Sequence, residues 1–283
     1  MKLPDIAREP TVKALIKAAL KEDVGSGDAT SIALVPEAAM SRAVLIAKSK
    51  CVVSGTGIAE AVFKQVDKRV KCAVRIKDGA PAKPSQTIMT ISGPTRAILT
   101  AERTALNFMQ RMTGIATLTN IFVKIAGKYK VSILDTRKTT PTLRILEKYA
   151  VLCGGGRNHR MGLYDMILIK DNHRASWGTD LGAAIEQARR KFPRLKIEIE
   201  VENEAQLKKA LAALPDWVLL DNMKAPQLRR CVKICGKRAK IEASGGITLK
   251  NIVEIAKTGI DAISMGCLTH SVPATDLSLE ICR

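Results

Sequence analysis

The chain has 283 residues, enough for one large domain or two, and its hydrophobic fraction of 46% and charged fraction of 26% are ordinary for a globular protein. No apolar run approaches the length of a membrane span and the N-terminus lacks a signal-peptide core, so we expect a cytoplasmic protein with no membrane association. The net charge of +19 could signal nucleic acid, anionic lipid or acidic small molecules as partners. Because no aromatic residues interleave with the basic clusters and no nucleic-acid motif appears, we attribute the charge to a solvated surface.

The first part of the chain predicts an α+β domain. Residues 5–22 are predicted to be helical, because Leu15, Ile16 and Ala19 form an apolar stripe. Short β-rich runs follow at residues 44–47, 51–53, 70–76 and 87–91, with turns at 54–57, 78–79 and 92–94. A long helix is predicted over 98–112. The final alternating residues, 276–281, predict one more strand, which we expect to return to this domain.

From about residue 131 short apolar runs alternate with helical patterns, which indicates a parallel sheet. The runs lie at residues 131–134, 166–169, 197–201, 217–220, 240–243 and 262–265. Each run ends in a polar group, and six such ends in succession indicate a ring of site residues on one rim of a barrel. We therefore predict an α/β fold, with an incomplete TIM-like α/β barrel over 116–267. Residues 1–115, joined by 268–283, would form the N-terminal α+β domain.

The segment from Gly154 to Arg160 combines a flexible backbone with a high density of cations. Three consecutive glycines precede Arg157, His159 and Arg160. Glycine allows the backbone to bend and to approach a ligand closely, and the planar arginine side chain matches carboxylates and phosphates with two bonds at a time. The segment therefore predicts binding of a small polyanion; taken alone, it is also compatible with a solvated basic loop.

Long motifs resemble the quinolinate phosphoribosyltransferase family, also called nicotinate-nucleotide pyrophosphorylase (carboxylating). They are residues 22–28, 101–114, 135–141, 154–160, 170–173, 198–202, 221–223 and 242–247, in order along nearly the whole chain. The resemblance implies a pentosyltransferase that joins quinolinate to phosphoribosyl pyrophosphate, releasing pyrophosphate and carbon dioxide. The product would be nicotinate mononucleotide, in NAD biosynthesis. One departure is Thr142, where glycine is expected after Pro141, and it bears on the shape of the loop rather than on activity.

The resemblance also implies roles for the cations. The residues that would hold the two carboxylates of quinolinate are Arg103, Arg137, His159, Arg160 and Lys170. Arg103 lies on the long helix of the other domain and would reach the site of a neighbouring subunit, although it is also compatible with a simple surface arginine. The expected assembly is therefore a homodimer with shared active sites, alone or within a higher oligomer. The catalytic set would be Lys138, Lys170, Glu200 and Asp221.

Glu200 and Asp221 are the acidic exceptions on a cationic rim. Carboxylates there can bind ribose hydroxyls and the Mg²⁺ that accompanies a pyrophosphate, directly or through water, because Mg²⁺ prefers oxygen ligands. They can also stabilise oxocarbenium character when the ribosyl–pyrophosphate bond breaks. The alternative is that they form salt bridges with Lys170 or Arg137, which need not exclude the first role.

Two glycine-containing strand ends are expected to bind phosphate, because barrels often bind phosphate at the loops after their last strands. The expected phosphoribosyl pyrophosphate site is Thr136, Lys138, Glu200, Asp221, Ser244, Gly245, Gly246, Ser264, Met265 and Gly266.

Two rival hypotheses remain. A paralogue on the same fold, such as nicotinate phosphoribosyltransferase or the molybdenum-associated relative, is disfavoured because the full set for a dicarboxylate is present. A nucleic-acid-binding protein is suggested only by the charge. A zinc site is not expected, since Cys231 and Cys235 have no second Cys or His pair at ligand spacing.

Overall fold

A computed structural model of the protein describes residues 3–178 and 180–282. It divides into two compact units. The first comprises Met1–Asn120, Thr139–Gly155 and Leu268–Arg283, and the second comprises Ile121–Lys138 and Gly156–Cys267. Residues 139–155, which lie inside the barrel domain predicted from the sequence, thus group with the first unit. In the described part of the chain, no helix is both long enough and apolar enough to span a bilayer.

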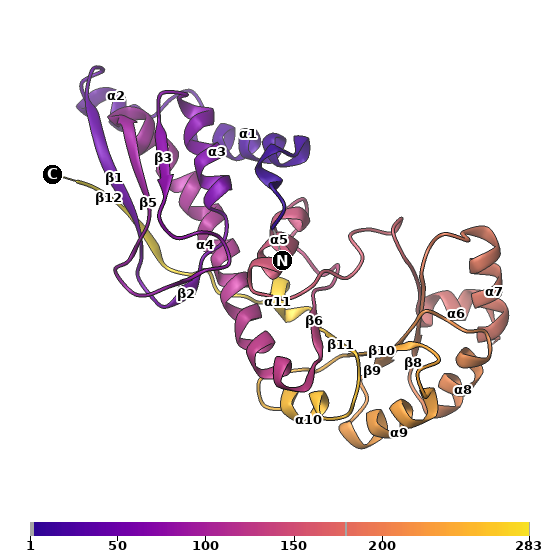
Figure 1. The fold of residues 1–283 in the computed structure, drawn as a ribbon. Helices are drawn as coiled ribbons and strands as arrows, with labels where there is room; N and C mark the ends of the chain where they lie inside the picture. The colour runs from indigo at the N-terminus through magenta and orange to yellow at the C-terminus, as the bar shows by residue number, and fades with distance from the viewer. Residues whose placement is uncertain (1–2, 179, 283) are drawn as a thin grey trace. The chain divides into compact units, whose positions relative to one another are not determined.

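The first unit has an antiparallel sheet with the strand order β12-β1-β5-β3 and a small β2-β4 pair (Figure 1). Its strands are β1 (Met40–Ala47), β2 (Cys51–Val52), β3 (Lys71–Val74), β4 (Pro81–Ala82), β5 (Thr87–Pro94) and β12 (Leu277–Ile281). Its helices are η1 (Ile6–Arg8), α1 (Pro10–Val24), α2 (Ala29–Leu34), α3 (Thr56–Val66), α4 (Thr95–Ala126), α5 (Arg144–Cys153) and α11 (Cys267–His270); α4 and α11 cross the unit boundaries.

Several predictions of where the helices of this unit begin and end were wrong. The helix predicted over 5–22 is two helices, because Pro10 begins α1 and fits only the first turn of a helix. The turn predicted at 54–57 contains the start of α3, where Asp78 accepts hydrogen bonds from the backbone N–H groups of Gly55 and Thr56. The helix predicted over 98–112 continues to Ala126.

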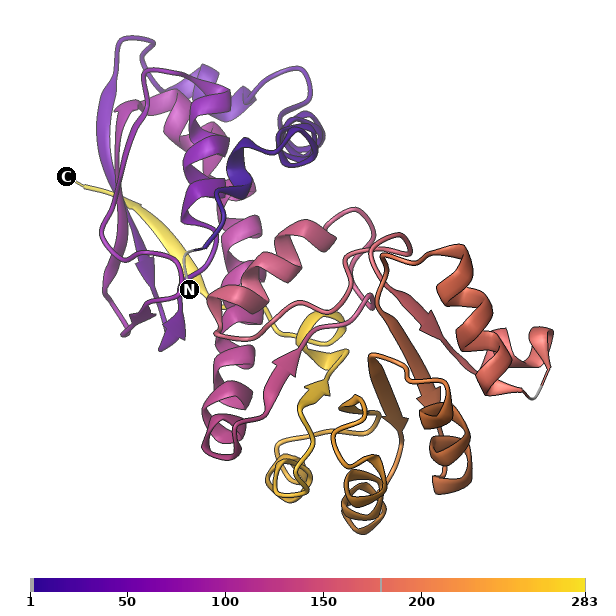
Figure 2. The same ribbon diagram turned by 45° about the vertical axis from the view of Figure 1, so that its right-hand side comes forward.

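The second unit has a six-stranded sheet with the order β6-β11-β10-β9-β8-β7, and all its ladders are parallel. The six strands predicted from the sequence are all confirmed: β6 (Ser132–Leu134), β7 (Ile167–Ile169), β8 (Ile197–Val201), β9 (Trp217–Asp221), β10 (Lys240–Ser244) and β11 (Ala262–Ser264). The helices are η2 (Gly127–Tyr129), α6 (Asp171–Trp177), α7 (Leu181–Lys191), α8 (Glu204–Ala212), α9 (Ala225–Cys235) and α10 (Ile252–Ala256). Helices α7 to α10 lie in an arc along the outer side of the sheet (Figures 1 and 2). The predicted incomplete α/β barrel is confirmed.

The central strands β8 and β10 carry acidic residues inside otherwise apolar sequences. All five residues of β8 are buried, including Glu198 and Glu200. Since successive side chains of a strand point to opposite faces, Glu198 and Glu200 share one face while the isoleucines occupy the other. Glu242 of β10 is likewise buried between apolar neighbours. Because helices cover the outer side of the sheet, these acids lie on its inner side.

The Thr142 departure has a local structural consequence. Thr142 has a φ of +68°, a left-handed backbone conformation that costs a β-branched residue energy and costs glycine little. The loop therefore has the shape that glycine favours, with a threonine in that place.

We expect Thr142→Gly to raise the free energy of unfolding by about 1 kcal/mol, because relief of the strained φ outweighs the added entropy of the unfolded chain. The matched control is Thr140→Gly, two residues away, where φ is not positive and the hydroxyl accepts a bond from Arg111. That change should lower stability. Urea unfolding of both variants measures the effect, and two substitutions of the same sign would contradict the assignment of strain to Thr142.

Candidate active site

The carboxyl ends of neighbouring parallel strands bring most of the predicted site residues of the second unit together. Asp221 ends β9 and is in register with Ser244 at the end of β10. Glu200 lies one residue before the end of β8, and Ser264 ends β11. Thr136, Arg137 and Lys138 follow β6, which pairs with β11. The sheet order therefore gathers these residues at one edge.

Cations lie close together at this edge. The Lys170 ammonium is 3.5 Å from a carboxylate oxygen of Glu200, so the salt bridge considered from the sequence is present. Burial lowers the pKa of the Arg160 guanidinium, and the nearby charge of Arg137 lowers it further. Two guanidinium groups that repel each other in a partly buried place form a ready site for an anion. Arg160 also donates to the carbonyl of Met166 at 3.1 Å.

The acids Glu200 and Asp221 lie beside these cations. Burial raises the pKa of Glu200; the charge of Lys170 offsets part of this rise, and the nearby carboxylate of Asp221 adds to it. The mutual repulsion of two carboxylates that point to the same edge would be relieved by a divalent cation. Their oxygen atoms are the ligands that Mg²⁺ prefers, so the residues present fit that ion.

The loop after β10 has a backbone that only glycine fits. Gly245 has a φ of +90°, and a Cβ there would collide with the side-chain oxygen of Asn222. The backbone N–H of Asn222 donates to the carbonyl of Ser244 at 2.9 Å, which ties the end of β9 to this loop. Gly246, with a φ of +60°, faces open space. An uncrowded backbone of this kind suits close approach of a phosphate.

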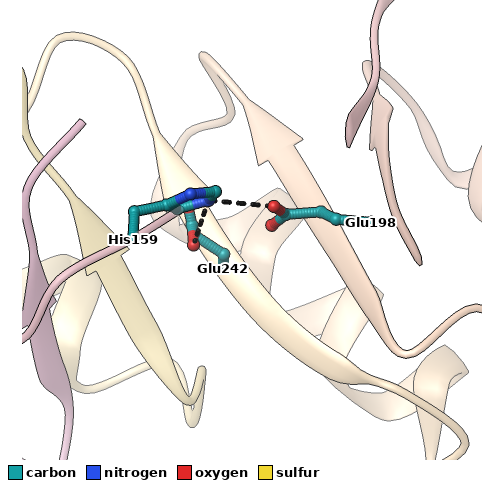
Figure 3. Close-up of side chains that lie close together, drawn as sticks. All are labelled: His159, Glu198 and Glu242. Atoms are coloured by element: carbon teal, nitrogen blue, oxygen red, sulfur yellow. Dashed lines mark hydrogen bonds and ion pairs between the residues drawn. The ribbon is translucent and has the colours of Figure 1, made fainter. Parts of the chain in front are cut away.

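His159 is held by protein atoms at both ring nitrogens (Figure 3). Nε2 lies 2.9 Å from Glu198 Oε2 and 3.5 Å from Glu242 Oε2, while Nδ1 accepts from the backbone N–H of Arg160 at 2.7 Å. A neutral ring that accepts at Nδ1 carries its proton on Nε2 and directs it toward the carboxylates. A direct bond from His159 to a substrate would require release of one of these contacts.

Asp135 fixes the backbone of the segment that carries His159. Its side chain is fully buried and accepts from the backbone N–H of His159 at 2.9 Å and from the Asn158 amide at 2.8 Å. Asp135 therefore fixes the backbone of the segment, while Glu198 and Glu242 hold its imidazole.

The three residues missed by the sequence analysis as site members are Asp135, Glu198 and Glu242. Each belongs to a recognised motif, but none had an assigned role. The available signal was an acidic residue at an inward position of a buried β-pattern, since a carboxylate is rarely fully buried without a specific partner. Arg103 lies in the first unit, on α4, with an exposed side chain.

Burial raises the pKa values of both Glu198 and Glu242 well above the ordinary range of a glutamate. For Glu198, the charges of Arg160 and Lys170 offset part of the rise. For Glu242, proximity to Glu198 adds to the rise and His159 opposes it. The pair therefore retains protons at a pH at which an exposed glutamate is ionised.

Fold and site together define an α/β-barrel protein with cations and acids gathered at the carboxyl ends of its strands. Residues 28–113 and 115–280 match the family models of the quinolinate phosphoribosyl transferase N-terminal and C-terminal domains. The chain belongs to the quinolinate phosphoribosyltransferase family.

Similar proteins support the same assignment. A probable nicotinate-nucleotide pyrophosphorylase [carboxylating] of Bacillus subtilis is 41% identical over 95% of this chain and 93% of its own length. One from Methanocaldococcus jannaschii, also named as probable, is 42% identical over 95% and 96%. The solved structure of the nicotinate-nucleotide pyrophosphorylase from Francisella tularensis superposes with a TM-score of 0.92, at 38% identity, over 99% of this chain and 98% of that one.

The raised acid pKa values predict a pH dependence of stability. Below the ordinary pKa near 4.5, folded and unfolded chains are both protonated at Glu242; as the pH rises toward about 8, only the folded chain keeps the proton. The free energy of unfolding should therefore fall over this range. Glu242→Gln removes one titrating group and should reduce that fall by on the order of 1–2 kcal/mol.

Urea unfolding across this pH range measures the effect. Glu254→Gln makes the same substitution on the exposed side of α10 and should leave the fall in stability over this range as in the wild type. A Glu242→Gln variant with an unaltered pH dependence would contradict the assignment of retained protons to this pair.

Proposed function

We propose that this protein transfers the phosphoribosyl group of phosphoribosyl pyrophosphate to quinolinate, with decarboxylation, in de novo NAD biosynthesis. The products are nicotinate mononucleotide, pyrophosphate and carbon dioxide. Membership of the family supports the reaction. The observation that carries it at the residue level is that Arg137 lies near enough to Arg160 to lower its pKa, while Lys170 is paired with Glu200 of the same sheet.

Quinolinate has two adjacent carboxylates, and Arg137, Arg160 and Lys170 are the cations proposed to hold them. A dianion between the two guanidinium groups replaces their repulsion by attraction, and bidentate arginine contacts fix the plane of the pyridine ring. Fixed orientation of the ring nitrogen toward the anomeric carbon of the ribose lowers the entropic part of the barrier. His159 is proposed to hold this set in place through its contact with the Arg160 backbone.

Glu200 and Asp221 are proposed to bind the ribose hydroxyls and to hold Mg²⁺, directly or through water. When bound, Mg²⁺ would neutralise charge on the pyrophosphate. The two carboxylates would also stabilise positive charge on the ribose ring as the bond to pyrophosphate weakens. Lys170, 3.5 Å from Glu200, keeps that carboxylate oriented.

The phosphates of phosphoribosyl pyrophosphate are proposed to bind at the loops after β6, β10 and β11. Backbone N–H groups near Gly245 and Gly246 suit the 5′-phosphate, together with the loop of residues 264–266. Thr136 and Lys138 are proposed to contact the pyrophosphate; the hydroxyl of Thr136 accepts from the Lys138 backbone at 3.0 Å, which shapes their turn.

Decarboxylation then needs no nucleophile from the protein. Once the pyridine nitrogen is ribosylated, its positive charge stabilises the electron pair that remains on the ring carbon when the adjacent carboxylate leaves as carbon dioxide. A proton taken up at that carbon completes the step. One site therefore serves both transfer and decarboxylation.

We further propose a cytoplasmic homodimer, alone or within a higher oligomer, in which Arg103 of one subunit completes the site of the other. The support is that Arg103 is exposed on α4 although it belongs to one of the motifs shared with the family.

The direct test is incubation with quinolinate, phosphoribosyl pyrophosphate and Mg²⁺, with detection of nicotinate mononucleotide and carbon dioxide in equal amounts. Turnover should stop when Mg²⁺ is chelated and return when it is restored. Absence of turnover by a folded wild-type protein would contradict the proposal.

We expect Arg137→Ala and Arg160→Ala each to leave a folded protein and to weaken quinolinate binding by about 2–4 kcal/mol, because each removes one partner of a desolvated charge pair. Calorimetric titration measures the affinity. Arg229→Ala, an exposed position on α9, removes the same charge and should bind as the wild type does. Wild-type affinity in the Arg137 and Arg160 variants would exclude their role.

Subunit mixing tests the role of Arg103. If it completes a neighbour's site, mixing inactive Arg103→Ala with inactive Lys170→Ala subunits should restore activity, because both lesions fall in one of the two composite sites of a mixed dimer and leave the other intact. Labelled subunits verify exchange. Exchange without recovery would count against a shared site.

A further inference from the structure

Glu198 and Glu242 have no role in the proposed chemistry, yet both side chains are buried inside the same unit. We propose that Glu198 and Glu242 are positioning residues: they hold the His159 ring across the interior of the incomplete barrel and thereby hold Arg160 in place for quinolinate. This inference rests on the proposed function and deepens it, since it assigns a task to residues that contact no substrate.

The segment that carries His159 is attached to one edge of the sheet. The backbone N–H of Arg157 donates to the carbonyl of Ile133 at 2.8 Å, and that of Asp135 donates to the carbonyl of Arg157 at 3.2 Å. The segment thus lies along β6 as a short parallel extension. Asp135 fixes the backbone as far as the N–H of His159, and beyond Arg160 the Asp165 carboxylate accepts from the N–H groups of Met161 and Gly162.

The His159 ring extends from this edge to the far side of the sheet. Glu242 lies on β10, two strands from β6, and Glu198 lies on β8, four strands from β6. Leu219 of the intervening β9 is level with Glu242 in the register. Figure 3 shows dashed lines from one nitrogen of the ring to both carboxylates, with Glu242 next to the ring and Glu198 on the side of the view opposite His159. One imidazole therefore links three separate parts of an open sheet.

Stability alone does not account for two carboxylates in this place. Each has one oxygen near His159 Nε2, and the other oxygen, Oε1, is buried without a hydrogen-bond partner among the described residues. Such burial is costly, and apolar side chains of similar volume often make a protein as stable or more stable. The two acids are explained if their contact with His159 serves binding.

The contact reaches the substrate site through the next residue. The Arg160 N–H donates to His159 Nδ1, so the orientation of the ring sets the backbone direction from which the Arg160 side chain departs. The Arg160 guanidinium then has a further contact at the Met166 carbonyl. Without the carboxylates the ring can rotate, and the Arg160 N–H loses its acceptor between two backbone positions that stay held. Ser264, at the end of β11, is also hydrogen-bonded to Glu242, so Glu198→Leu is the variant that leaves the phosphate loops untouched.

The test uses Glu242→Leu and Glu198→Leu, which keep volume but remove the oxygen that His159 needs, and Glu242→Gln, which keeps an acceptor. We expect each leucine variant to unfold at the same or higher urea concentration than the wild type. At the same time, KM for quinolinate should rise roughly tenfold to a hundredfold, the scale of effect of a small misplacement, with KM for phosphoribosyl pyrophosphate little changed in Glu198→Leu. Glu242→Gln should keep the wild-type KM for both substrates.

Ile241→Ala is the matched control, since it removes a buried side chain from the opposite face of the same strand without touching His159. It should lose stability and keep its KM for quinolinate. If the KM of Ile241→Ala for quinolinate rises as much as that of the leucine variants, the effect is structural and the inference is overturned. A wild-type KM for quinolinate in Glu242→Leu and Glu198→Leu overturns it as well.

Two further outcomes are decisive. Should one leucine variant fail to fold, the other carries the test, because both contact the same nitrogen. A stoichiometric metal ion in the purified wild type that is lost in Glu242→Leu would overturn the hydrogen-bonded arrangement. Wild-type turnover of quinolinate is measured in every experiment, so failure of the proposed function would show in the wild type and failure of this inference only in the variants.

Discussion

Three buried carboxylates of the second unit, those of Asp135, Glu198 and Glu242, constrain the rest of the site. An ionised or even a protonated carboxyl group in such a place requires polar partners, and the segment from Asn158 to Arg160 supplies them. The segment is therefore attached to β6 through its backbone and to β8 and β10 through one imidazole. This arrangement presents Arg160 from a rigid base at the open edge of the barrel.

The charged side chains at the carboxyl ends of the strands suit the proposed binding of polyanions. Arg137 and Arg160 repel each other, Lys170 is paired with Glu200, and Asp221 adds a second carboxylate at the same edge. A dianion would add attraction to the two arginines, whose mutual repulsion Glu198 and Asp165 offset in part, and a divalent cation would do the same for the two acids. Substrates with adjacent carboxylates and phosphates satisfy both.

The sequence predicted the barrel strands well, because six apolar runs with polar ends can be arranged in few ways. It missed α3, since the glycines at 55 and 57 favour a turn unless the bonds from Asp78 are known. The grouping of 139–155 with the first unit depends on tertiary contacts that no local pattern reveals. Site residues on strand ends could be proposed from position alone. The partners of His159 could not, because Glu198 and Glu242 are separated from it by 39 and 83 positions and meet it only through the curvature of the sheet.

The central claim is that the rim recognises two adjacent carboxylates on one ring, and direct competition between quinolinate and nicotinate tests it most directly. Nicotinate keeps the ring and one carboxylate but lacks the second. With both compounds present at equal concentration, phosphoribosyl pyrophosphate should be consumed with release of one carbon dioxide per nucleotide formed, which means that quinolinate alone is used. Nucleotide formation from nicotinate at a comparable rate, without carbon dioxide, would contradict the account.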